Sequence, residues 1–198
     1  MTSANFEKAL VALSNRKFFK NISISRGIER EALRSNLNGV ISKTRHPKSL
    51  GSALTNPFIT TDFAEALIEM VTPTFDTVQG LHSFLENLDF FVKENLNDEI
   101  LWNASMPCEL GDEKQIQIAE YGVSNTGRLK NIYRRGLRER YGSAMQCVSG
   151  IHYNFSLSKK SWQNFLNQNE SNQAEIDKAY FGLIRNVKRN YWLIAYLF

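Results

Sequence analysis

The sequence contains few cysteines and lacks the segments that send a chain to a membrane or an export pathway. Among its 198 residues the cysteines are Cys108 and Cys147, whose spacing matches neither a metal-binding motif nor a disulfide framework. Residues 1–19 show no continuous apolar core that ends in a small-residue cleavage site, and no apolar run approaches the length of a membrane span. The composition therefore predicts a cytoplasmic protein with reduced thiols and no membrane partner.

Several common nucleotide-binding and catalytic motifs are also missing. The sequence has no Gly-rich phosphate loop of the Walker or Rossmann type and no nucleophile elbow. If ATP binds to this chain, metal ions and scattered side chains must therefore hold it.

Neither sign of charge dominates the sequence. Lys and Arg number 24 against 20 Asp and Glu, which gives a net charge of +4. Such a mild excess is compatible with anionic ligands and gives weak support to a nucleic-acid partner, which normally needs a concentrated basic face. The most basic segment, residues 130–140, is best interpreted as an exposed helix face, with phosphate or nucleic-acid binding as the alternatives.

The residues that are present predict a globular chain that forms one domain or part of a larger one. Hydrophobic residues make up 42% of the sequence and aromatic residues 12%, which is typical of a chain with a packed core. Apolar residues recur at helical spacing in some segments and alternate in others, so we expect an α+β fold in which helices flank an antiparallel sheet. The expected helices cover residues 5–14, 76–95, 126–141, 159–167 and 174–190, and the expected strands cover residues 22–35 and 145–157.

Local signals refine the boundaries of two expected helices. Asp76 and Gln79 resemble a capping box at the start of the helix over 76–95. Gly142 is expected as the C-cap of the helix over 126–141.

The region between the first strand and these helices is predicted in less detail. Asn38-Gly39 is the dipeptide of a tight hairpin turn, after which Val40 and Ile41 would begin a returning strand. Residues 45–61 are predicted to form a loop, and residues 62–72 fit either a helix or a strand.

The last eight residues, 191–198, are apolar and aromatic. Because terminal residues are usually polar and loosely held, we expect the natural chain to continue beyond Phe198. The alternative is a terminal element that docks in the core.

Two acidic groups are candidates for metal binding. Glu29 and Glu31 lie two apart in a predicted strand, so their side chains share a face, and divalent cations such as Mg²⁺ prefer such carboxylate oxygens. Asp62, Glu65 and Glu69 form a second acidic cluster. For both groups the alternative is a solvated face, with Arg26 and Arg30 neutralising the first pair.

The strand over 145–157 is predicted to be half-buried with one polar face. His152 and Asn154 lie on that face, where a histidine could contact a metal ion or a carboxylate ligand. A structural histidine held by hydrogen bonds is an equal alternative.

Several segments, in order along the chain, match one known family. They are RGIEREALR at 26–34, HP at 46–47, LGSALT at 50–55, ITTDFAEAL at 59–67 with Glu69, SMPC at 105–108, YGVSNTGR at 121–128, YR at 133–134, GL at 136–137 and SGIHYNFS at 149–156. From about Ile24 to the last residue the sequence therefore resembles the glutamate–cysteine ligases of proteobacterial type. Asn103 and Ala195 stand where close relatives would carry proline, and members of the family are considerably longer.

The resemblance implies a fold and a reaction. It implies that residues 1–198 are the N-terminal part of a single catalytic domain, truncated at the C-terminus, whose antiparallel sheet is of the glutamine synthetase type and is incomplete in this chain. The implied reaction joins L-glutamate, through its γ-carboxylate, to L-cysteine and converts ATP to ADP and phosphate. It uses Mg²⁺ (or Mn²⁺) as a cofactor and is the first step of glutathione synthesis. The alternatives are an inactive fragment and a non-catalytic module that binds nucleotides or amino acids.

The resemblance also implies residue roles. Glu29, Glu31, Asp62 and Glu69 match sheet carboxylates that bind or support metal ions, and His152 matches a residue near the metal and the glutamate. The cysteine pocket is matched by Phe63, Tyr133 and Leu137, and Arg134 is a candidate contact for phosphate or substrate.

Overall fold

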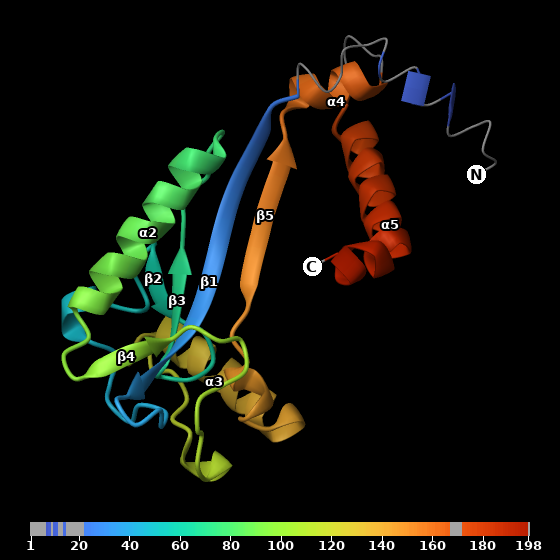
Figure 1. The fold of residues 1–198 in the computed structure, drawn as a ribbon. Coiled ribbons are helices and arrows are strands. Elements are labelled where there is room, and N and C mark those ends of the chain that lie inside the picture. The colour runs from blue at the N-terminus through green and yellow to red at the C-terminus, as the bar shows by residue number, and fades with distance from the viewer. Residues whose placement is uncertain (1–6, 9, 12–13, 15–21, 167–171, 198) are drawn as a thin grey trace. The chain divides into compact units, whose positions relative to one another are not determined.

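The computed structural model describes residues 7–8, 10–11, 14, 22–166 and 172–197. The chain divides into two compact units: residues 26–155 form a sheet unit, and residues 1–25 with 156–198 form a helical unit. Figure 1 shows the elements of both units. The helix expected over 5–14 falls largely outside the described residues.

Five strands form the sheet, and the α+β prediction is confirmed. The strands are β1 (Ile24–Asn36), β2 (Ile59–Thr61), β3 (Leu67–Val71), β4 (Glu99–Trp102) and β5 (Ile151–Leu157). Their order is β2-β3-β1-β4, and β5 also pairs with β1. The registers of β1 with β3 and β4, and of β2 with β3, are antiparallel.

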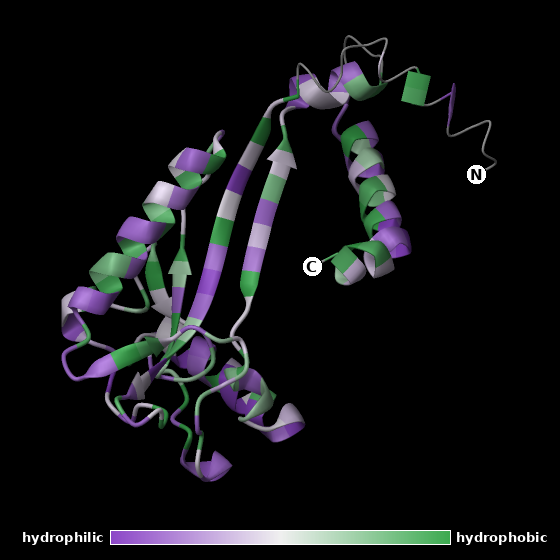
Figure 2. Cartoon of the chain, in the orientation of Figure 1, coloured by the Kyte–Doolittle hydropathy of each residue, from purple (hydrophilic) through white to green (hydrophobic). Residues whose placement is uncertain are grey.

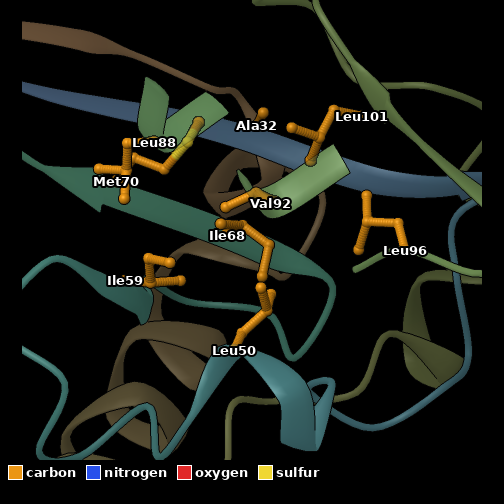
Figure 3. Close-up of a cluster of buried hydrophobic side chains, with 9 residues drawn as sticks. All are labelled: Ala32, Leu50, Ile59, Ile68, Met70, Leu88, Val92, Leu96 and Leu101. Atoms are coloured by element: carbon orange, nitrogen blue, oxygen red, sulfur yellow. The ribbon is translucent and has the colours of Figure 1, made fainter. Parts of the chain in front are cut away.

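Helix α2 (Val78–Glu94) covers one face of this sheet. Leu88 and Val92 from the helix pack against Ala32 of β1 and against Ile68 and Met70 of β3 (Figure 3). Ala32, Ile68 and Val92 are fully buried. Figure 2 shows that hydrophobic and hydrophilic residues alternate along α2. The buried residues of this helix are Leu81, Leu88 and Val92, which recur at helical spacing.

The start of α2 differs from the expected capping box. Thr77 is the N-cap, and its side chain accepts a hydrogen bond from the backbone N–H of Gly80, whereas Asp76 lies one residue before the cap. The predicted Asp76 and Gln79 pair is therefore wrong by one residue, because a threonine hydroxyl also serves as a cap.

Short strands are the main difference between the expected and observed elements of the sheet unit. Ile59–Thr61, expected as loop, forms β2, and β4 lies between α2 and α3, where no strand was expected. The ambiguous segment resolves as β3, which rules out its helical alternative. The strand expected from residue 145 begins only at Ile151, because residues 145–147 form a turn of 3-10 helix.

The turn after β1 is present, but the returning strand is not. Gly39 has a φ of 78°, the left-handed conformation that favours glycine in a tight turn. Val40 and Ile41 form isolated bridges, one of them parallel to Glu109, and make no continuous strand.

Helix α3 (Asn125–Tyr141) has its N-cap at Ser124. Its C-cap is Gly142, as the sequence predicted. Its only buried residue is Gly127. Short turns of 3-10 helix occupy Lys48–Leu50 and Glu113–Gln115 elsewhere in the unit.

Both cysteines are free thiols buried in a second apolar cluster of the sheet unit. Burial, together with the neighbouring Cys108, raises the pKa of Cys147 to about 12. Cys147 therefore stays protonated and weakly nucleophilic at neutral pH.

The helical unit contains α4 (Lys159–Leu166) and α5 (Gln173–Leu197). Trp162 of α4 packs edge-on against Tyr180 of α5, with ring centroids 4.7 Å apart. Apolar residues near the end of α5, such as Trp192 and Tyr196, are exposed. None of the described helices is both long and apolar enough to cross a bilayer.

Candidate metal and substrate site

The face of the sheet opposite α2 carries the predicted acidic residues. The antiparallel register places Glu31 of β1 directly opposite Glu69 of β3, and Glu29 opposite Val71. Asp62 follows β2 and begins the turn into β3, with its N–H bonded to the carbonyl of Leu67 at 3.1 Å. Strand parity thus brings Glu29 and Glu31 to one face, as predicted, and the pairing of β1 with β3 adds Glu69 to them.

Residues at and before β5 hold the two carboxylates of β1. The backbone N–H of Gly150 donates to Oε2 of Glu31 at 2.7 Å. The side-chain amide of Asn154 donates to Oε1 of Glu29 at 2.9 Å, and Nδ1 of His152 lies 3.3 Å from Oε2 of the same residue. His152 and Asn154 therefore share one carboxylate, which fixes its orientation.

The absence of a side chain at Gly150 allows this arrangement. A Cβ built on Gly150 would lie 3.3 Å from Nε2 of His152 and 3.4 Å from Oε2 of Glu31. The histidine and the glutamate thus both approach the backbone where glycine leaves space for them.

Burial, with added repulsion from neighbouring carboxylates, raises the pKa values of Glu31 and Glu69. The pKa of Glu69 rises to about 7, first because of burial and then because of the nearby charges of Asp62, Glu31 and Glu29. Burial also raises the pKa of Glu31, with Asp62 and Glu29 adding to the shift, while the N–H of Gly150 and the charge of His152 oppose it. These carboxyls therefore form one electrostatically coupled group.

The chemistry of this group fits a divalent cation, although the group does not form a closed ligand set. Oxygen donors from several carboxylates suit Mg²⁺ or Mn²⁺, and a cation would offset the neighbouring charges that, after burial, contribute to the raised pKa of Glu69. Among the residues that the structure describes, no three His, Cys, Asp or Glu side chains are arranged to hold a metal ion together. The predicted ligands are thus neighbours, and their roles in metal binding remain predictions.

The residues predicted for a cysteine pocket lie at different depths. Phe63 is 1% exposed and belongs to the second apolar cluster, with Leu137 of α3 packed against that cluster. Tyr133, also on α3, is 59% exposed. Tyr133 and Leu137 can therefore offer surface to a ligand, whereas Phe63 supports Leu137 from beneath.

Arg134 makes its contacts inside the chain. Its Nε donates to the backbone carbonyl of Asp62, its Nη1 donates to the carbonyl of Lys130 at 3.0 Å, and its guanidinium lies 4.7 Å from the ring centroid of Tyr121. Nη2, which neither carbonyl engages, remains available for the predicted contact of Arg134 with phosphate or substrate.

Glu65, the third member of the predicted second acidic cluster, is separated from the acidic face. It is 4% exposed, and its two carboxylate oxygens accept hydrogen bonds from the backbone N–H groups of His46 and Glu120. Glu65 is therefore a structural carboxylate that links two loops.

Tyr121 is a further residue of the site that no sequence pattern identifies. It is buried, and its hydroxyl donates to the carbonyl of Thr61 at 2.6 Å and lies 3.1 Å from that of Asp62. Its place in the segment YGVSNTGR marks it as part of a motif, but only the fold shows that the segment lies beside Asp62.

Comparisons with known proteins place the chain in a family and support its fold. The family model for glutamate-cysteine ligase matches residues 8–198. A glutamate–cysteine ligase from Saccharophagus degradans is 49% identical over 179 residues, which are 88% of this chain and 34% of the relative. The chain therefore belongs to the glutamate–cysteine ligase family.

Two solved structures share the fold. The glutamate–cysteine ligase of Francisella tularensis in complex with AMP has a TM-score of 0.81 and 42% identity, and the match covers 87% of this chain and 34% of that one. A bifunctional glutathione synthetase from Pasteurella multocida has a TM-score of 0.83 and 30% identity, and the match covers 96% of this chain and 25% of that one. The chain thus spans about a third or less of the length of these relatives.

Proposed function

We propose that this chain provides part of the site at which L-glutamate is joined, through its γ-carboxylate, to L-cysteine with conversion of ATP to ADP and phosphate. The product would be γ-glutamylcysteine, and the reaction would be the first step of glutathione synthesis in the cytoplasm. Membership of the glutamate–cysteine ligase family supports this function. The AMP bound to the relative from Francisella tularensis supports ATP as the co-substrate.

The observation that carries the proposal is the pairing of Glu31 with Glu69 on one face of the sheet. Two facing carboxylates with a raised pKa repel each other, and a cation between them removes that repulsion. We assign Glu29, Glu31, Asp62 and Glu69 as the residues that hold Mg²⁺, or Mn²⁺ in its place. When bound, such an ion neutralises phosphate oxygens and aligns them for transfer.

His152 is assigned to the contact with glutamate. Nδ1 of His152 lies 3.3 Å from Oε2 of Glu29, and Nε2 lies on the side of Gly150. A substrate carboxylate or a metal-bound group could then meet Nε2.

In the proposed reaction the γ-carboxylate of glutamate attacks the γ-phosphate of ATP and gives γ-glutamyl phosphate. The amine of cysteine then displaces phosphate. Tyr133 and Leu137 would line the cysteine pocket, with Phe63 beneath Leu137. Arg134 would contact a phosphate oxygen or a substrate carboxylate through Nη2.

Metal binding tests this proposal directly. We expect Mn²⁺ to bind to the chain, as measured by electron paramagnetic resonance, and to bind about tenfold or more weakly to Glu31→Gln and Glu69→Gln. Glu94→Gln, which removes an exposed carboxylate from α2, is the matched control and should bind as the unmodified chain does. Equal affinities in all four proteins would disprove the metal role.

Turnover tests the reaction itself. We expect the protein that contains this chain to form γ-glutamylcysteine from ATP, glutamate and cysteine, and Glu69→Gln to lower kcat/KM far more than Glu94→Gln does. Binding of Mg·ATP and glutamate without any product would instead support a non-catalytic module.

A further inference from the structure

The backbone around Asp62 is held by hydrogen bonds from a segment more than fifty residues away. The N–H of Ala119 donates to the carbonyl of Phe63 at 2.9 Å, and the N–H of Glu65 donates to the carbonyl of Gln117 at 2.8 Å. Residues 117–121 therefore run beside the turn at 61–65 and pair with it.

Two side chains complete this contact at Asp62 itself. The Tyr121 hydroxyl donates to the carbonyl of Thr61 and reaches that of Asp62, and Nε of Arg134 donates to the carbonyl of Asp62. The Arg134 guanidinium also lies over the Tyr121 ring. We call Tyr121 and Arg134 the Asp62 anchor.

Helix α3 is packed closely enough to bring Arg134 to this carbonyl. A Cβ on Gly127 would lie 2.4 Å from the carbonyl oxygen of Tyr121, so only glycine allows the helix to approach residue 121 as it does. The side-chain amide of Asn131 also donates to the carbonyl of Ala119 at 3.0 Å. The anchor is thus built on a fixed helix.

We propose that Tyr121 and Arg134 are positioning residues that orient the Asp62 carboxylate toward Glu31 and Glu69. Both backbone groups of Asp62 are engaged, the N–H by Leu67 and the carbonyl by the anchor, so its side chain leaves a fixed point of the turn. This inference rests on the metal role proposed above. It assigns Arg134 a function in the free protein that needs no contact with phosphate.

The charge of Arg134 makes the proposal distinguishable from simple electrostatics. A guanidinium near a cation site repels the cation, so its removal alone would strengthen metal binding. If Arg134 positions Asp62, its removal weakens metal binding instead. The sign of the change in affinity therefore separates the two explanations.

The main experiment compares Mn²⁺ affinity in Tyr121→Phe, Arg134→Gln and Lys130→Gln. Lys130 lies over the same ring at 4.8 Å and carries the same charge as Arg134, but its side chain makes no hydrogen bond to Asp62, which makes it the matched control. We expect binding about tenfold weaker in Tyr121→Phe and Arg134→Gln, and unchanged or slightly tighter in Lys130→Gln. Stronger binding in Arg134→Gln would overturn the proposal.

Asp62→Asn separates a failure of this inference from a failure of the proposed function. If Asp62→Asn binds Mn²⁺ as the unmodified chain does, Asp62 is no ligand and the metal role assigned to it is wrong. If Asp62→Asn weakens binding, Tyr121→Phe should have little further effect in that background. An equal effect of Tyr121→Phe in both backgrounds would show that the tyrosine acts elsewhere.

Hydrogen exchange provides a readout that requires no metal. We expect the amides of Asp62, Glu65 and Leu67 to exchange at least several-fold faster in Tyr121→Phe than in Lys130→Gln, with the amides of α2 unchanged in both. Unchanged exchange at residues 62–67 would exclude the anchor, whatever the result for Mn²⁺.

Discussion

The two faces of the sheet, which share the same strands, differ in character at the middle of β1 and β3. At one position of the β1 and β3 ladder Glu31 faces Glu69, and at the next Ala32 faces Ile68. The second pair is buried beneath α2, whereas the first is coupled to further carboxylates. A step of one residue along a strand thus separates the stabilising core from the candidate site, and the two faces should respond in opposite ways to substitution.

The largest effect is expected on the apolar face. Ile68→Ala should lower the free energy of unfolding by about 2–5 kcal/mol, because Ile68 is fully buried among Met70, Leu88 and Val92 and its truncation leaves a cavity. Urea denaturation would measure the change. Glu69→Ala, one residue along on the other face, is the control and should not destabilise the metal-free chain. A comparable loss in both variants would contradict the division into two faces.

The close packing of α3 against Tyr121, beside the acidic face, can be disrupted by a substitution at Gly127. Gly127→Ala should destabilise the chain by about 1–3 kcal/mol, because the new methyl group would collide with the backbone of Tyr121. Gly136→Ala in the same helix meets only the flexible end of Arg140, at 3.1 Å, and should be neutral or stabilising by up to about 1 kcal/mol. Thermal denaturation of both variants tests this difference, and destabilisation of equal size would indicate a general intolerance of α3.

On the acidic face, removal of a charge should stabilise the metal-free chain. The folded pKa of Glu69 is about 7 against 4.5 for an ordinary glutamate, so the folded chain binds more protons between these values and loses stability as the pH rises through them. Glu69→Gln should therefore be more stable by roughly 1–2 kcal/mol above pH 7, after allowance for solvent screening. The gain should shrink as the pH falls toward 4.5.

Urea denaturation in the presence of a chelator would follow this gain across the pH range. Added Mn²⁺ should reverse the order of stability, because the cation stabilises the unmodified chain more than the variant. A gain that does not depend on pH would contradict the repulsion between carboxylates.

The smallest effect is expected at the start of the helix that covers the apolar face. Thr77→Ala removes the hydroxyl that caps α2 and should cost about 1 kcal/mol. Asp76→Ala should cost less, since Asp76 is not the cap. Circular dichroism on heating would compare the stability of the two variants. A larger loss of stability in Asp76→Ala than in Thr77→Ala would support the capping box expected from the sequence.

The sequence predicts the long elements well and the short ones poorly. β1, α2 and α3 each repeat a hydrophobic pattern over many residues, and they occur close to their expected bounds. β2 and β4 have three and four residues, too few for a period to be recognised. They form because neighbouring strands offer free backbone groups, and a single segment does not contain that information.

The candidate site shows the same limit. Parity within β1 places Glu29 and Glu31 together, since only local geometry is needed. The position of Glu69 opposite Glu31 depends on the register between strands nearly forty residues apart, and that of Tyr121 beside Asp62 depends on a loop pairing with a turn. The sequence offered Asp62 and Glu69 only as members of an acidic cluster that could equally be solvated, and the family resemblance gave them a metal role. Tyr121 stands in a segment that carries the resemblance, but neither pattern nor resemblance gave it a role.

The pairing of Glu31 with Gly150 has a consequence for the order of events during synthesis. These residues are 119 positions apart, and Gly150 gives its N–H to the Glu31 carboxylate and its carbonyl to the Glu31 N–H. At about 5–20 residues per second a ribosome needs roughly 6–24 s to add that stretch of chain. The stretch of β1 around Glu31 therefore leaves the ribosome seconds before β5 exists, and its backbone edge is open to other partners during that interval.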